Sequence, residues 1–127
     1  MEQGLRQRLL DDPAVATIVG TRVDWDVRPQ RSAYPAIVLE TIEGRRTQHM
    51  AGFNTFRATA VQASCFATSK AQAVAMREAV IAAIAGEATA RGKRFLRAQD
   101  IEHRQRPENT GTQTIHREIV EATIWHD

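Results

Sequence analysis

Apolar side chains recur at helical spacing in two parts of the chain. In residues 2–11, Leu5, Leu9 and Leu10 alternate with charged and amide side chains, which is the pattern of a short amphipathic helix. In residues 69–85 a stripe of small and branched apolar residues follows Ser69 and Gln72, whose S-x-x-Q spacing is that of a capping box. The pattern therefore predicts an N-terminal helix and one long central helix.

The N-terminal helix is interrupted at Asp12-Pro13. Aspartate is a favoured cap, and proline at the first helical position loses no hydrogen bond because that N–H has no partner inside a helix. Val15 and Ile18 supply an apolar side for a further short helix, and Gly20 stands where a glycine commonly ends one. We therefore expect the helix to break or turn at this point.

Strand patterns occupy much of the remaining sequence. Residues 36–44 begin with four consecutive apolar residues and then alternate, which is typical of a strand buried on both faces at its start. Further strands are predicted at residues 22–27, 55–67, 94–105 and 113–126. The segment PENTG joins the last two, so we expect them to pair as a hairpin.

The last predicted strand has apolar residues on both faces. Val120, Ala122 and Ile124 share one face, and the other face carries Ile119, Thr123 and Trp125. Either the sheet is covered on both sides, or one side is covered by another subunit.

These elements predict a single α+β domain spanning residues 1–127. We expect one mixed, mostly antiparallel β-sheet of four to five strands. The N-terminal helix and the long central helix should pack mainly on one face of it. Residues 45–54 are expected to be a connecting loop or a flexible extension of the two flanking strands.

Composition makes this an ordinary globular chain. It has 127 residues, of which 43% are hydrophobic and 25% charged, and 17 basic residues stand against 15 acidic ones. No apolar run approaches the roughly 20 residues of a membrane span, and no secretory signal is visible at the N-terminus. Cys65, the only cysteine, lies in an apolar strand pattern and is expected to be a buried core residue. We expect the protein to be made in a reducing cytoplasm.

Asp24 and Asp26 form the first candidate site. If residues 22–27 are a strand, both carboxylates point to one face, where such a pair can share a proton or hold a metal ion. Arg22 and Arg28 flank the pair at the same spacing. Ion pairing with these arginines is the simpler interpretation.

The histidines form the second candidate site. If the hairpin turn is centred on residues 109–110, His103 and His116 face each other across the two strands. Zinc requires three or four ligands, however, and a shift of the register by one residue would separate the pair. His49 and His126 are expected to be exposed.

No pattern of nucleophilic or phosphate chemistry is present in the sequence. It lacks a G-x-S-x-G elbow, a phosphate-binding glycine loop and a motif histidine for Cys65. We therefore predict that the chain is not an enzyme and that it uses neither a cofactor nor a metal ion.

The segment RRTQHMAGFN, residues 45–54, is the strongest candidate for a binding surface. Arginines beside an adaptable methionine and an aromatic residue suit a protein interface, and arginines also suit a phosphate backbone. An ordinary polar hairpin loop is the alternative. The residues assigned to a subunit or partner interface come from this segment and from the last strand: Arg45, Arg46, His49, Met50, Phe53, Ile119, Thr123 and Trp125.

The order of these segments resembles one family, the tail-terminator or tail-completion proteins of long-tailed phages and of phage-derived particles such as gene transfer agents. The resemblance covers nearly the whole chain. It is carried by the opening helix with Leu5 and Leu9, DPAVATIVGTRV at 12–23, Tyr34-Pro35 before AIVLE, VQASCFA at 61–67, the S-x-x-Q-A helix start and the closing strand near Trp125.

The resemblance implies a structural protein of the virion, assembled in the bacterial cytoplasm and located at the head–tail interface. Such proteins cap the finished tail tube as a ring, usually a hexamer. The isolated protein can be a monomer that forms the ring only on the tail. The implied partners are further copies of the chain, the major tail-tube protein and head–tail connector proteins. DNA would only pass through the channel, and no membrane is involved.

Two alternatives stay open at this point. The chain could be another head–tail adaptor or minor tail protein of the same particle. It could also be a small nucleic-acid-binding domain, which would bind DNA in a salt-dependent way.

Overall fold

The computed structural model describes residues 1–27, 33–49, 52–109 and 114–127. For residues 43–49, 52–56 and 108–109 the description is of the backbone alone.

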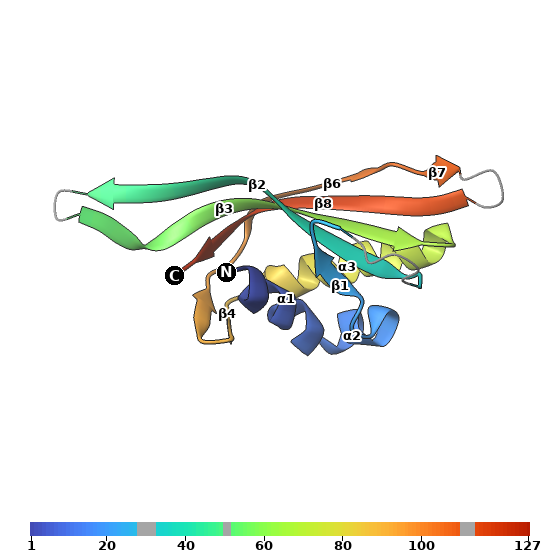
Figure 1. Ribbon diagram of the computed structural model, residues 1–127, viewed down its shortest axis with the longest axis horizontal. Coiled ribbons are helices and arrows are strands. Elements are labelled where there is room, and N and C mark those ends of the chain that lie inside the picture. The colour runs from blue at the N-terminus through green and yellow to red at the C-terminus, as the bar shows by residue number, and fades with distance from the viewer. Residues whose placement is uncertain (28–32, 50–51, 110–113) are drawn as a thin grey trace.

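The described residues form one mixed β-sheet with three helices on one of its faces (Figure 1). The strand order is β1-β2-β3-β8-β5-β4, and β6 and β7 also pair with β8. The β1–β2 pair is parallel and the other pairs are antiparallel. The helices are α1 (Glu2–Asp11), α2 (Pro13–Val19) and α3 (Lys70–Ile84); the strands are β1 (Val23–Trp25), β2 (Ala36–His49), β3 (Gly52–Ala67), β4 (Ala88–Ala90), β5 (Lys93–Phe95), β6 (Gln99–Gln105), β7 (Glu108–Asn109) and β8 (Thr114–His126).

The α+β class and the mixed sheet agree with the prediction, but the expected four to five strands were too few. The described residues contain eight. The predicted strand 94–105 is divided because the chain leaves β8 after β5 and returns to it in β6, while Ala98 donates its N–H to the carbonyl of Ile84. The strands β4 and β5 form a hairpin around Arg91 and Gly92, which both have positive φ. Three-residue strands are too short for periodicity to reveal.

The break predicted at Asp12-Pro13 is present, so the fold has two separate helices, α1 and α2, where the expected architecture had one N-terminal helix. Asp12 has extended backbone, and its Oδ1 accepts the N–H groups of Ala14 and Val15 at 2.9 and 3.2 Å. It therefore caps α2, whose first residue is Pro13. The start of α3 is as predicted, with the N–H of Gln72 donating to Ser69 Oγ at 3.2 Å.

Of the two expectations for residues 45–54, a loop or an extension of the flanking strands, the second is confirmed: residues 45–49 and 52–54 continue β2 and β3 as a long ladder. Arg45 pairs with Ala58, and His49 pairs with Gly52. In Figure 1 this part of β2 and β3 extends beyond the helices at the left of the molecule. We call residues 43–49 and 52–57 the arm; it begins at a bulge between Thr41 and Glu43. None of the described helices covers the arm, and the arm's sequence lacks the alternation that burial of one face imposes.

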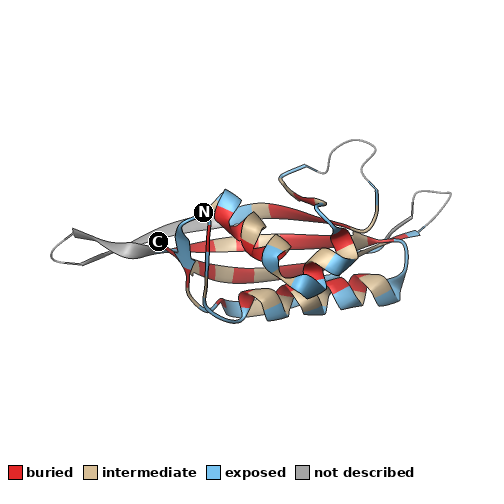
Figure 2. Ribbon diagram, turned by 90° about the horizontal axis from the view of Figure 1, so that it is seen from below, coloured by how far each residue is buried: buried red, intermediate tan, exposed pale blue. Residues whose placement is uncertain are grey.

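The core lies between the sheet and the three helices (Figure 2). Leu5 and Leu9 of α1, with Met76 and Val80 of α3, pack against the alternate residues of the central strands that face them. Cys65 is fully buried among them, as predicted. Burying each such side chain contributes roughly 1.5–3 kcal/mol, and this packing holds the helices on one side and leaves the other side of the sheet uncovered by helices.

Candidate interface surface

The proposed aspartate site does not form. The strand β1 ends at Trp25, and Asp26 has φ 66°, so the alternation that would place Asp24 and Asp26 on one face stops between them. The N–H of Asp26 donates to the carbonyl of Leu39 at 2.8 Å. Arg22 does not support the pair either, because its Nε donates to the carbonyl of Pro35 at 2.7 Å. Arg28 lies outside the described residues.

The proposed histidine pair is also separated. His103 pairs with Val120, which is four residues along β8 from His116 and therefore about 13 Å away. The register differs from the predicted one because Glu108 and Asn109 continue the ladder, opposite Ile115 and Thr114. The ladder therefore continues through residue 109, past the place predicted for the turn. Within the described parts of the chain, no group of three His, Cys, Asp or Glu residues could hold a metal ion.

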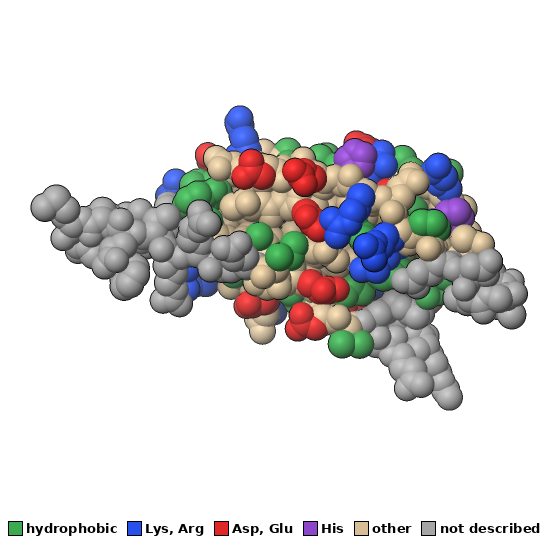
Figure 3. Space-filling model, turned by 90° about the horizontal axis from the view of Figure 1, so that it is seen from above, with side chains coloured by type: hydrophobic (Ala, Val, Ile, Leu, Met, Phe, Trp, Pro, Cys, Tyr) green, Lys and Arg blue, Asp and Glu red, His purple; other side chains and the backbone are tan. Residues whose placement is uncertain are grey.

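The face of the sheet turned away from the helices is polar and charged (Figure 3). Across its centre the register aligns Glu40 of β2, Gln62 of β3, Glu121 of β8 and Glu102 of β6. The neighbouring row, Leu39, Ala63 and Val120, belongs to the core, so this row points to the opposite side. We call Glu40, Glu121 and Glu102 the glutamate row.

Two arginines lie on the same face near the glutamate row. Arg104 forms an ion pair with Glu121, and its Nη2 donates to Gln62 Oε1 at 3.5 Å. The guanidinium of Arg117 lies over the ring of Phe66 at 5.2 Å and donates to Ser64 Oγ at 3.0 Å. Both arginines contact residues of neighbouring strands, so charge on this surface is held by cross-strand contacts.

The predicted interface residues of the last strand differ in accessibility. Ile119 is 1% exposed, between Ser64 and Arg104 in neighbouring strands, so in this chain it has no surface to offer a partner. Thr123 and Trp125 are half-buried on the same face, and the indole Nε1 donates to Gln99 Oε1 at 3.2 Å. Among the predicted surface residues of this strand, these two are available for contact.

The predicted interface residues of the arm lie in strands. Arg45, Arg46 and His49 are in β2, and Phe53 is in β3 opposite Gln48. Met50 lies outside the described residues.

Sequence reasoning missed the glutamate row and an exposed apolar residue. Ile42 is 53% exposed and falls at the bulge where the arm begins. The glutamates are separated by up to 81 positions, and only the strand register brings them together. Like charges on adjacent strands are a signal, but one that is visible only after the register is known.

His126 was expected to be exposed and is 4% exposed instead. Its Nδ1 lies 3.1 Å from the main-chain oxygen of Asp127, which can only accept, so Nδ1 donates. In the neutral ring Nε2 then accepts from the hydroxyl of Thr59, 2.8 Å away. This bond joins β8 to β3 beside the root of the arm.

Folding should weaken in acid because of His126. Burial lowers the pKa of His126, the charges of the Met1 amino group and Arg57 lower it further, and Asp127 opposes them. In the unfolded chain the pKa of His126 is near 6.5, and in the folded chain it is lower. The stability that comes from keeping His126 neutral is therefore complete above pH 6.5 and is lost as the pH falls towards the pKa of the folded chain. Each unit of difference is worth about 1.4 kcal/mol.

Urea unfolding at pH 7.5 and pH 5.0 measures this effect. In a His126→Gln variant, which cannot titrate at this position, the difference between the two pH values should shrink. An unchanged difference would contradict the assignment to His126.

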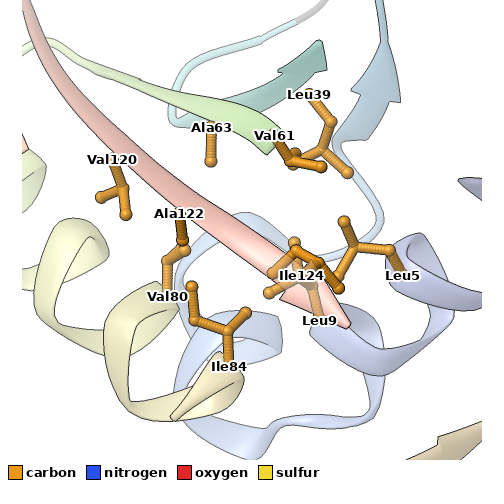
Figure 4. A pocket seen from close by; sticks show the side chains of 10 residues that line it. All are labelled: Leu5, Leu9, Leu39, Val61, Ala63, Val80, Ile84, Val120, Ala122 and Ile124. Carbon is orange, nitrogen blue, oxygen red and sulfur yellow. The ribbon is translucent and has the colours of Figure 1, made fainter. Parts of the chain in front are cut away.

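A small cavity inside the core is not a ligand site (Figure 4). Its volume of about 20 Å³ would admit roughly one water molecule. All ten side chains that line it are apolar, so a water would find no partner there: Leu5, Leu9, Leu39, Val61, Ala63, Val80, Ile84, Val120, Ala122 and Ile124. It is a packing gap between α1, α3 and the sheet.

None of the described helices is long and apolar enough to cross a membrane.

Comparison with known proteins gives one family and a structural relative. The family described as "Tail completion protein gp17" matches residues 3–126. No curated protein matches the chain significantly. The fold is similar to that of a chain in the solved structure titled "Virion of native gene transfer agent (GTA) particle", with a TM-score of 0.72 and 19% identity, covering 100% of this chain and 95% of that one. At that identity, the likeness is one of fold.

Proposed function

Because the chain belongs to the tail completion protein gp17 family, a family of structural virion proteins, we propose that it caps the completed tail tube as a ring and forms the tail side of the head–tail junction. The observation that carries the proposal is the family match, which spans residues 3–126.

The shape of the chain supports assembly into a ring. A closed ring is built from heterologous contacts, in which two different surfaces of each copy meet. The arm extends beyond the helices at one end of the sheet, and the uncovered sheet face lies over the body (Figures 1 and 3). These are two different surfaces, as a heterologous contact requires. A hexamer is the expected number of copies.

The partners of this ring would be the major tail-tube protein on one side and connector proteins of the head on the other. Contacts between copies or with these partners would involve the predicted interface residues of the 45–54 segment: Arg45, Arg46, His49, Met50 and Phe53. Thr123 and Trp125 would extend the same contact surface on the body.

Deleting the gene should leave the particle without finished tails. A tube that is not capped keeps adding subunits and cannot join a head, so electron microscopy of lysates should show overlong tails without heads. Supplying the gene from a plasmid should restore normal particles. Tails of normal length on normal heads, without the gene, would contradict the proposal.

The same experiment separates the nearest alternative function. A head–tail adaptor of the head side would leave tails of normal length that fail to attach, whereas loss of a cap changes the distribution of tail lengths. Tail length is therefore the measurement that decides between them.

A further inference from the structure

Among the described residues, the glutamate row has three carboxylates and one ion pair, between Arg104 and Glu121. Neighbouring strands are about 4.8 Å apart, and Glu102 lies directly opposite Glu121. Like charges in that arrangement are destabilising. Arg104 pairs with Glu121, and Arg117 lies at the row of Phe66, two residues along β8 beyond Ile119. Glu102 is exposed, Glu40 and Glu121 are half-buried, and the guanidinium of Arg104 lies beside Glu121.

The arm has the opposite character. Residues 43–57 contain three arginines, Arg45, Arg46 and Arg57, against a single acidic residue, Glu43. The arm also runs away from the glutamate row of its own chain. Arg45 pairs with Ala58, which is four residues, or about 13 Å, along β3 from Gln62. Gln62 lies between Glu40 and Glu121 of the glutamate row. From Arg45 the strand leads further away.

We propose that the arm of one copy docks on the glutamate row of the neighbouring copy. This inference rests on the proposed ring and specifies how its copies meet. The occupant is a second copy because the basic and acidic surfaces belong to the same chain and cannot meet within it. Their repetition from copy to copy produces the head-to-tail contact that closes a ring.

The surface between the two charged regions is continuous. Thr123 pairs with Ala60, and Trp125 pairs with Ala58, so both lie on the sheet face between the row and the root of the arm. A docked arm would cover an apolar and hydroxyl surface as well as the carboxylates. The charges would select the register of the contact and suppress other pairings.

A charge exchange tests the docking. Arg45→Glu with Arg46→Glu reverses the arm, and Glu40→Arg with Glu102→Arg reverses the row. Each double variant, as the full chain, should reduce the number of normal-length tails joined to heads by about tenfold or more, because like charges then meet at every contact. A chain carrying all four substitutions should recover most of the wild-type number.

Matched controls keep the test decisive. Lys70→Glu with Arg91→Glu makes the same change of net charge as the arm reversal, on exposed residues at the start of α3 and in the β4–β5 turn, and should assemble normally. Circular dichroism melts establish that each variant is folded. The inference is overturned if either reversal assembles normally, if the fourfold variant stays defective while the control works, or if the control fails equally.

These outcomes also separate the inference from the proposed function. If deletion of the gene gives unfinished tails but the reversed variants terminate tails normally, the capping function stands and the docking fails. If deletion leaves tails normal, the function itself fails.

Discussion

Replacing Phe95 with alanine is expected to destabilise the fold by about 3–5 kcal/mol. The ring is 0% exposed and sits where three elements converge. The guanidinium of Arg8 lies 5.5 Å from its centroid, and the ring of His126 lies 6.4 Å away at 45°. The backbone of α1 comes so close that a Cβ on Gly4 would stand 3.1 Å from Phe95 Cζ.

Truncation at Phe95 would also disturb a buried cation. Arg8 is 5% exposed, and it donates to the carbonyls of Ala83, at 3.1 Å, and Gly86, which close the end of α3. Burial lowers the pKa of Arg8. Without the ring, one face of this guanidinium loses its packing and the cation–π contact, so the loss should exceed that of an isolated core phenylalanine of equal burial.

Urea unfolding followed by circular dichroism measures the effect. Phe95→Leu keeps part of the volume and serves as the matched variant, for which a smaller loss is expected. A loss below about 1 kcal/mol for Phe95→Ala would show that the site collapses around the missing ring.

Replacing Arg77 with methionine should have an effect of similar size, about 3–5 kcal/mol, because it leaves a buried carboxylate without its counter-charge. Glu118 is 2% exposed on β8, and its Oε2 lies 3.6 Å from Nη1 of Arg77 on α3. Cys65 of β3 lies directly opposite Glu118 and shares its surroundings of low polarity. Burial, together with the charge of Glu118, raises the pKa of the Cys65 thiol to about 12.

Two variants isolate this buried pair. Adding Glu118→Gln to Arg77→Met removes the unpaired carboxylate charge and should recover much of the lost stability. A double-mutant cycle measures this recovery. Glu78→Gln removes the exposed partner that Arg77 binds at 2.8 Å, and should change stability by at most about 0.5 kcal/mol. Equal losses for Arg77→Met and Glu78→Gln would show that the buried pair is not responsible.

The two wrong predictions of a site share one origin. Asp24 and Asp26 were assumed to lie in one strand, and His103 and His116 were assumed to flank a turn at residues 109–110. In both cases a strand ended or continued one or two residues away from the expected place. Local propensity is least informative at the boundaries of strands, because the hydrogen-bond partners that define a boundary belong to other strands.

The sequence by itself determined the helices, the caps at Asp12 and Ser69, the central strands and the family. Each of these depends on side chains within a few turns or on an order of segments that is visible along the chain. Only the tertiary structure decided that residues 45–49 extend a strand, that His126 and Ile119 are buried, and that Glu40, Glu102 and Glu121 form one row. The physical reason is register, because a ladder joins residues that lie far apart in sequence, and a shift of one residue moves every side chain to the opposite face.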